Sequence, residues 1–244
     1  MRNRLLVLMY HRILRCADDF ASCAAGERRY AVTAATLDEH LACVGRAGVV
    51  RCLVTFDDSY ETHYSQAFPV LAARGVEATF FVTVGEIGRG ERLSWGQLRE
   101  MSQGGMSIES HGWSHRFMTM VDGGGLSDEL ARSRERLEDE LGRPVRALSL
   151  PGGRYDTRVL EAARLAGYER VFCSDVGINR GESLPFPAKR LAVRRDMGTK
   201  FIERALVRPA RGLWTEALRW RALSLARGVL GERIYAKVTG RPAV

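Results

Sequence analysis

A repeated order of amphipathic segment, glycine and short apolar run constrains the fold of this chain more than any other feature. Seven runs are rich in β-branched and aromatic residues and have the length of buried strands. They are Leu5 to Tyr10, Val49 to Phe56, Ala78 to Val84, Met106 to Glu109, Arg146 to Leu150, Glu169 to Cys173 and Arg190 to Val193. Five of the intervening stretches end in glycine, the usual left-handed stop of a helix: Gly48, Gly75, Gly105, Gly142 and Gly167. The pattern predicts repeated helix–strand units and a parallel sheet.

Seven parallel strands can close only as an incomplete or distorted barrel. We therefore predict an α/β fold, a distorted (β/α)7 barrel. The chain has 244 residues, close to the roughly 250 that such barrels use as one domain. We expect the barrel domain over residues 1–207 and a basic, amphipathic helical extension over residues 208–244.

Two pairs of residues with metal-binding chemistry follow predicted strands. Asp57 and Asp58 end the run that begins at Cys52, and His111 and His115 follow the strand around Met106 to Glu109. A separation of four would place both imidazoles on one side of a helical turn, where they could share an ion. Two histidines and one carboxylate form a common open Zn²⁺ shell, which leaves the other aspartate free to act as a base. Either pair alone could be structural, as surface histidines or as a helix cap; together they predict a metal hydrolase.

The motifs resemble those of the polysaccharide deacetylase family, carbohydrate esterases that share the NodB homology domain. Thr55-Phe56-Asp57-Asp58 resembles the first family motif, Ser110-His111 to His115 the second, and Leu150 to Asp156 stands in the place of the third. The resemblance runs from about Leu5 to about Leu206 and implies the same barrel fold. It implies that Asp57 is the catalytic base and that Asp58, His111 and His115 bind one divalent ion, with Zn²⁺ expected first and Co²⁺, Ni²⁺ or Fe²⁺ as alternatives.

Three departures from the family pattern stand out. Ser59 replaces a usual glycine, a mild change if its backbone φ stays negative. Ser149 replaces the arginine that usually orients the catalytic aspartate, so that role is vacant or falls to Arg154 or Arg190. The usual Leu-x-His motif is missing near Leu191-Ala192-Val193.

His11 is a candidate for the missing histidine. It ends the run Leu5 to Tyr10, as Asp57 and Asp58 end theirs, and parallel barrel strands open on the same face. An imidazole there could donate a proton or bind substrate. The alternative is that His11 only caps its strand, while His40 and His63 are interpreted as structural or solvated.

Further residues are expected to contact the substrate. The third motif suggests Pro151, Gly152 and Tyr155, with the backbone N–H next to Tyr155 stabilising an oxyanion as the resemblance implies. Arg154, Arg190 and the ring of Trp113 complete the expected set: Pro151, Gly152, Tyr155, Trp113, Arg154 and Arg190. The loop from Ala17 to Tyr30 is interpreted as punctuation within one domain. The polar stretch from Arg15 to Arg29 is interpreted as a surface loop, with a mobile active-site loop as the alternative.

Cysteine usage and the N-terminal run favour a cytoplasmic location. The five cysteines form no Cys-x-x-Cys pair, and their odd number disfavours a disulfide framework. Leu5 to Tyr10 is too short for the core of a signal peptide and is needed as a strand.

Basic residues are concentrated in the C-terminal segment. Of the net charge of +8, much lies between Arg204 and Arg241, where only Glu216 and Glu232 are acidic. Leucines and tryptophans alternate with these bases and suit an amphipathic helix, with a break expected near Gly231. Its apolar side could dock on the barrel, or the helix could lie on an anionic membrane surface. Nucleic-acid binding has only the charge to support it and is not expected.

The expected reaction is hydrolysis of the N-acetyl group of an N-acetylated amino sugar in a glycan or glycan precursor. The absence of a carbohydrate-binding module favours a biosynthetic intermediate as the substrate. A basic tail would suit such a substrate if the substrate carried phosphate or a membrane anchor. Two alternatives remain. The protein could be a catalytically impaired glycan-binding or scaffold protein of a polysaccharide-synthesis complex, or a hydrolase of another small amide.

Overall fold

The computed structural model describes residues 4–46 and 50–230. Seven parallel strands lie in the order β10-β1-β4-β5-β6-β7-β8, and the short strand β9 (Asn179–Arg180) pairs antiparallel with β1. The seven are β1 (Arg4–Tyr10), β4 (Arg51–Phe56), β5 (Ala78–Val82), β6 (Ser107–Ser110), β7 (Ala147–Ser149), β8 (Arg170–Phe172) and β10 (Leu191–Ala192). Each coincides with a run predicted from the sequence.

The barrel is distorted where β8 and β10, the two ends of the strand order, approach each other. The gap between β8 and β10 is spanned by one parallel bridge between Phe172 and Ala188, in which the Cys173 N–H donates to the Ala188 carbonyl at 2.9 Å. This confirms the expected distorted (β/α)7 barrel. A separate pair, β2 (Ile13–Leu14) and β3 (Val32–Thr33), leads into the first long helix.

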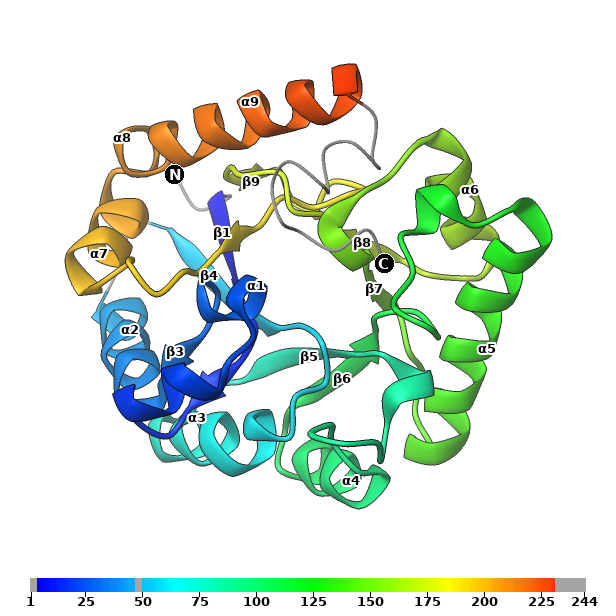
Figure 1. Ribbon diagram of the computed structural model, residues 1–244, viewed down its shortest axis with the longest axis horizontal. Helices are drawn as coiled ribbons and strands as arrows, with labels where there is room; N and C mark the ends of the chain where they lie inside the picture. The colour runs from blue at the N-terminus through cyan, green and yellow to red at the C-terminus, as the bar shows by residue number, and fades with distance from the viewer. Residues whose placement is uncertain (1–3, 47–49, 231–244) are drawn as a thin grey trace.

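Helices surround the strands (Figure 1). They are α2 (Ala34–Arg46), α3 (Phe68–Arg74), α4 (Trp95–Gln103), α5 (Gly123–Leu141), α6 (Thr157–Leu165) and α7 (Thr199–Val207). Gly75 and Gly142 end α3 and α5 in the left-handed conformation, with φ of 60° and 63°. Gly105 and Gly167 also have positive φ, as the stop signals predicted, whereas Gly48 lies outside the described residues.

Alternate residues of the strands face two different cores. Leu6, Leu8 and Tyr10 of β1 belong to the large cluster under the helices. Val7 instead joins a small cluster with Phe81, Ala147 and Phe172 inside the barrel, where a strand's period of two must place it. Residues just past the strand ends that follow the same alternation also point inward. Their side chains therefore meet inside the mouth of the barrel.

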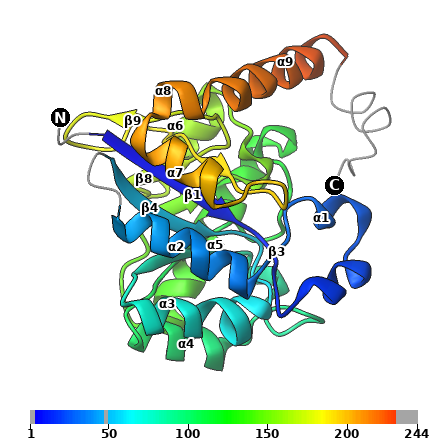
Figure 2. The same ribbon diagram turned by 90° about the vertical axis from the view of Figure 1, so that its left-hand side faces the viewer.

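The basic C-terminal segment is divided into three helices. Pro209 cannot donate to the preceding turn, so α7 ends and the short α8 (Pro209–Gly212) begins, followed by α9 (Trp214–Leu230). The helical structure of this segment is interrupted at Arg208 and at Leu213, and the expected break near Gly231 lies outside the described residues. Figure 2 shows α9 running along the outside of the barrel. None of the described helices combines the length and apolar character needed to cross a bilayer.

Candidate active site and metal centre

Asp58, His111 and His115 converge at the mouth of the barrel. The Asp58 Oδ1 atom lies 3.2 Å from His111 Nε2 and 3.1 Å from His115 Nε2, and the three ligand atoms all lie within 4.8 Å of one another. The Nδ1–H of His111 donates to the Ser149 carbonyl at 2.7 Å, which leaves its Nε2 lone pair directed at the cluster. The donor set and the fixed tautomer fit a divalent ion with an open position for a ligand.

The two histidines do not lie on a helical turn, and this part of the prediction is wrong. Residues 111–115 form a loop in which Gly112 has φ of 78°. Glu129 of α5 shapes it, because one carboxylate oxygen accepts the backbone N–H groups of Trp113 and Ser114 at 3.0 and 2.9 Å. The loop, rather than a helix, brings His115 back towards His111.

Left-handed backbone conformations are concentrated at this site. Asp58, Ser59 and His115 have φ of 76°, 57° and 62° and are the non-glycine residues with positive φ in the described chain. The condition under which serine would be a mild change at position 59, a negative φ, is therefore not met. Its hydroxyl accepts the Thr83 N–H at 2.7 Å and its carbonyl accepts the Leu93 N–H at 2.8 Å, and these bonds hold the turn in place. Strain of this kind is typical of functional sites.

Asp57 is held by a bidentate pair with Arg190. Arg190 Nη1 donates to Asp57 Oδ1 and Nη2 to Oδ2, both at 2.8 Å, and the Ser149 hydroxyl donates to Oδ2 at 2.8 Å. Arg190 is fully buried and its Nε donates to the Cys173 carbonyl at 3.0 Å. The sequence left open whether Arg154, Arg190 or no residue orients Asp57. The structure shows that Arg190 orients it, together with Ser149.

Asp57 is ionised in this setting. Burial alone would raise the pKa of its carboxyl group, but the positive charge of Arg190, with smaller effects of His111, holds the pKa below its usual value. A buried carboxylate that is charged and oriented can accept a proton at neutral pH.

A cavity of about 440 Å³ opens over the cluster of Asp58, His111 and His115. Asp57, Asp58, His111 and His115 line its floor, and His11 lies in its wall as expected. The Nδ1 atom of His11 is buried without a hydrogen-bond partner among the described residues, and its ring lies 5.2 Å from that of Tyr30. Its side chain makes no strand cap within residues 4–46 and 50–230, and it is available to a ligand.

The third motif contributes only part of the expected contacts. Gly152 and Arg154 line the cavity, and the Arg154 guanidinium lies 3.7 Å from the centre of the Phe117 ring. Pro151 is instead buried, and the Tyr155 hydroxyl donates to Asp175 Oδ2 at 2.8 Å.

Trp113 and Arg190 also differ from their expected roles. The Trp113 ring packs against the core and under the Arg132 guanidinium, 4.0 Å from its centre, and does not line the described cavity. Arg190 is buried beneath Asp57, so it positions the base rather than contacting substrate.

Several wall residues were not predicted from the sequence. The stretch from Arg15 to Arg29, interpreted as a surface loop with an active-site loop as the alternative, supplies Glu27 to the cavity. Tyr30 directly follows it, and α9 supplies Trp220. The Trp220 Nε1–H donates to Asp175 Oδ1 at 2.8 Å, so Asp175 holds both Trp220 and Tyr155. Periodicity assigned Trp220 to an amphipathic helix, but only the packing of that helix identifies it as part of the site.

Comparison with known proteins assigns a family to this arrangement. The family model described as polysaccharide deacetylase matches residues 47–171, just over half of the chain. The chain is 32% identical over 157 residues to the putative polysaccharide deacetylase YxkH of Bacillus subtilis strain 168, covering 64% of this chain and 51% of that protein. It is 27% identical over 162 residues to a chitin deacetylase of Pestalotiopsis sp, covering 61% and 50%. The chain thus spans about half the length of these curated relatives.

Solved structures share the fold. The Streptococcus pyogenes deacetylase PplD, determined in complex with acetate, has a TM-score of 0.74 at 22% identity and covers 82% of this chain and 96% of its own. The structure of IcaB from Ammonifex degensii has a TM-score of 0.72 at 25% identity, covering 88% and 98%.

Proposed function

Because the chain belongs to the polysaccharide deacetylase family, we propose that it hydrolyses the N-acetyl group of an N-acetylated amino sugar. The observation that carries this proposal is the ionised, doubly held Asp57 beside the ligand cluster of Asp58, His111 and His115. We propose Zn²⁺ as the ion, with Co²⁺, Ni²⁺ or Fe²⁺ as alternatives that accept the same donors. The ion would supply Lewis acidity, polarising the amide carbonyl and making water more acidic.

The protein's own groups would perform the proton transfers. Asp57 would accept a proton from water as its oxygen bonds to the acetyl carbon. His11 faces the same cavity and would give a proton to the amine nitrogen as the C–N bond breaks. The products are acetate and a free amino group. Arg190 and Ser149 would keep the Asp57 oxygens aligned throughout.

Of the two alternatives, only the first differs from this proposal in what it requires of Asp57. A glycan-binding or scaffold protein would need the ligands but not a buried, oriented carboxylate, so the Arg190 pair favours catalysis. A hydrolase of another small amide would use the same groups and differ only in the substrate that it accepts.

Acetate release tests the proposal directly. Metal-loaded protein would be assayed with an N-acetylglucosamine oligomer and with nucleotide-linked and lipid-linked N-acetylhexosamines. We expect release by the wild type, at least 100-fold slower release by Asp57→Asn, and one metal ion per chain in both. Asp38→Asn, which alters an exposed ion pair with Arg74, is the matched control. No release from any substrate with metal still bound would contradict deacetylation of these sugars; equal release by Asp57→Asn would contradict the role of the base.

The outer side of α9 supports a second proposal, contact with an anionic membrane. Trp214, Leu218 and Leu225 recur at helical spacing and are 60%, 59% and 70% exposed. Arg221 lies on the same side of the helix, and the one acidic residue described in α9, Glu216, is engaged by Arg194. An exposed apolar stripe with arginine suits the interface of an anionic bilayer. The cytoplasmic location stays a prediction from the cysteine pattern.

A further inference from the structure

A second large cavity, of about 550 Å³, opens at the other end of β1 from the active site. Arg4, the first residue of β1, lines this cavity, whereas His11, just after the last residue of β1, lines the active-site cavity. The remaining walls come from the segment around β9, from Lys189 and from the helices α8 and α9. The cavity is therefore separate from the candidate active site, and its volume is in the range of small-ligand sites.

Three cationic side chains line this cavity. Arg4 comes from β1, Arg180 from β9 and Lys189 from the segment before β10, and all three are exposed. No acidic residue is among the described residues of the lining, and none of the three cations forms an ion pair within residues 4–46 and 50–230. We call this feature the basic cleft, defined by Arg4, Arg180 and Lys189.

Two of these charges lie directly opposite each other in the sheet. Arg4 and Arg180 are partners in the antiparallel pairing of β1 with β9. Opposite residues of such a pair have Cβ atoms about 5 Å apart on the same face, so two positive charges there destabilise the pairing. An anion bound between them would turn this repulsion into attraction. Charge complementarity therefore points to an anionic ligand.

The side chain of Asn179 joins the three segments that carry the cations. It is 3% exposed, and its Nδ2–H groups donate to the carbonyls of Lys189 and Leu5 at 2.9 and 3.4 Å. Its Oδ1 accepts the Lys189 N–H at 2.9 Å. The Lys189 stem also packs on Gly177, where a Cβ would come within 2.9 Å of Lys189 Cδ. The backbone under the cations is thus fixed before a ligand binds, which lowers the entropic cost of binding.

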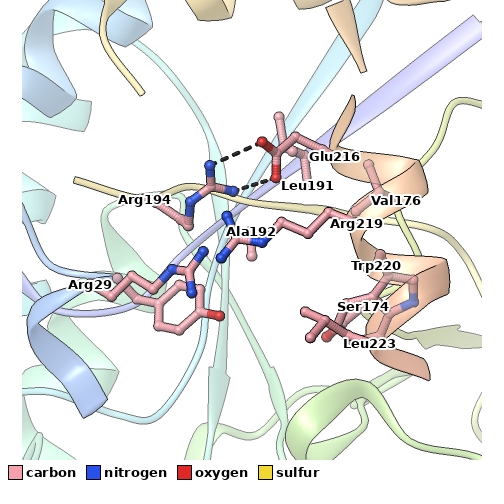
Figure 3. Close-up of a pocket in the computed structure, with 11 residues that line it drawn as sticks. Arg29, Ser174, Val176, Leu191, Ala192, Arg194, Glu216, Arg219, Trp220 and Leu223 are labelled. Carbon is pink, nitrogen blue, oxygen red and sulfur yellow. Dashed lines mark hydrogen bonds and ion pairs between the residues drawn. The ribbon is translucent and has the colours of Figure 1, made fainter. Parts of the chain in front are cut away.

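The first turn of α9 is held beside the basic cleft. Figure 3 shows a small pocket between α9 and the barrel, which Arg219 and Trp220 also line and in which Arg194 donates to both oxygens of Glu216. Glu216 lies two residues after Trp214, so this pair also fixes the turn that carries Trp214.

Trp214 gives the basic cleft an apolar rim. It lines the cleft and also belongs to the exposed stripe that continues along α9 with Leu218 and Leu225. An indole at such a position suits the boundary between a polar headgroup and apolar chains. A ligand that carries both a phosphate and apolar chains would use the cations and Trp214 together, whereas a soluble phosphate would use only the cations.

We propose that the basic cleft binds the phosphate of an anionic phospholipid headgroup, whose apolar chains leave past Trp214. The two guanidinium forks match phosphate oxygens, and the Lys189 ammonium adds a point charge. This inference rests on the membrane contact proposed above for α9 and goes beyond the deacetylase function. Free phosphate presents the same chemistry to the cations, so the experiment has to separate the two sources.

Calorimetry with a soluble short-chain lipid tests the cleft without a membrane. Dihexanoyl phosphatidylglycerol, kept below its critical micelle concentration, would be compared with inorganic phosphate and with heparin. The full-length wild type would be compared with Arg4→Gln/Arg180→Gln, Arg180→Glu and Trp214→Ala. Arg99→Gln/Arg146→Gln removes the same charge from exposed ion pairs elsewhere on the barrel and is the matched control.

We expect the wild type to bind one short-chain lipid per chain, at least tenfold more tightly than inorganic phosphate. The Kd for the lipid should rise at least tenfold in Arg4→Gln/Arg180→Gln and stay within twofold in the control. Trp214→Ala should weaken binding of the lipid but not of phosphate. Unchanged lipid binding in Arg4→Gln/Arg180→Gln, or phosphate or heparin bound as tightly as the lipid, would overturn the proposal.

Arg180→Glu separates loss of the ligand site from loss of the fold. It should abolish lipid binding without lowering Tm, because it places opposite charges across the β1–β9 pairing. Lipid binding retained by this variant would contradict the role of the cations.

Vesicles separate this proposal from the membrane contact of α9. Leu218→Ser/Leu225→Ser changes residues that do not line the basic cleft, so it should weaken co-sedimentation with phosphatidylglycerol vesicles and leave the Kd for the short-chain lipid within twofold. Short-chain lipid bound by a wild type that ignores vesicles would support the cleft and count against membrane contact alone. Vesicle binding by a wild type that does not bind the short-chain lipid would overturn the cleft and leave membrane contact standing.

Discussion

Asp57 shows how a single buried carboxylate is kept charged and aligned. It is 2% exposed, and Arg190 and Ser149 together donate three hydrogen bonds to its two oxygens. Charge-assisted bidentate pairs of this kind fix geometry as well as charge. Arg190 is consequently a positioning residue whose effect on the reaction passes through Asp57.

We predict that Arg190→Lys lowers kcat by roughly 100-fold while KM changes little, because a lysine keeps a positive charge but cannot hold both oxygens. Bound metal should stay at one ion per chain by elemental analysis. Arg190→Met would leave Asp57 uncompensated and should also destabilise the fold by about 3–5 kcal/mol. A folded Arg190→Lys protein with unchanged kcat would show that the pair has no role in turnover.

His63 should make stability depend on pH. It is buried, its Nε2–H donates to the His11 carbonyl at 2.7 Å, and burial lowers its pKa to about 4. Below about pH 6.5 the unfolded chain takes up a proton that the folded imidazole resists, so stability falls as pH falls from 6.5 towards 4. The contribution of His63 between pH 7 and pH 5 should be about 2 kcal/mol.

Urea unfolding at pH 7 and pH 5 checks this prediction. His63→Gln can keep an N–H donor for the His11 carbonyl but does not titrate, so its stability should fall less between the two pH values than that of the wild type. The free energy of unfolding of each protein at pH 5 is compared with its own value at pH 7, so the packing cost of the substitution cancels. An equal loss in both proteins would assign the acid sensitivity to other groups.

At the scale of the element, α9 is attached to the barrel mouth by polar contacts. Arg194 in the segment after β10 pairs with Glu216, and Asp175 after β8 accepts from Trp220. Both contacts connect the helix to the region where β8 and β10 leave the barrel incompletely paired. Helix α9 thereby holds Trp220 against the cavity.

Removing the charge of Glu216 should loosen this attachment. Arg194 is 8% exposed, so Glu216→Gln should lower the free energy of unfolding by about 1–3 kcal/mol, because a buried charge loses its main partner. Chemical denaturation is the measurement. Glu169→Gln alters the exposed pair with Arg146 and should change stability by less than about 0.5 kcal/mol. Equal effects of the two substitutions would show that the Arg194 pair contributes no more than a surface pair.

At the scale of the whole molecule, α9 connects two surfaces. Its inner side brings Arg219 and Trp220 to the pockets, and its outer side exposes Trp214, Leu218 and Leu225. A helix lying in a bilayer interface would keep the cavity mouth next to the membrane surface. This arrangement would suit a lipid-linked substrate.

We expect the protein to co-sediment with vesicles of equal parts phosphatidylcholine and phosphatidylglycerol, and not with phosphatidylcholine alone. Binding should weaken in high salt, because the arginine contribution is screened. Substituting serine for Trp214, Leu218 and Leu225 together should abolish it, whereas Leu165→Ser, at an 89% exposed leucine of α6, should not. Binding to both kinds of vesicle would contradict the role of anionic lipid, and concentration-dependent dimers that bury the same face would contradict membrane contact.

The sequence by itself determined the barrel and the chemistry of its mouth. Apolar runs, glycine stops and the motifs at strand ends are local signals, and a parallel barrel brings all its strand ends to one face, so Asp57, Asp58, His111 and His115 could be predicted to meet. Tertiary structure alone decided what surrounds them. The left-handed loop of His115 depends on Glu129 of a distant helix, and the partner of Asp57 comes from Arg190, 133 residues later in the chain. The position of Trp220 follows from how α9 docks, because helical periodicity gives the spacing of side chains on a helix but not the surface on which that helix rests.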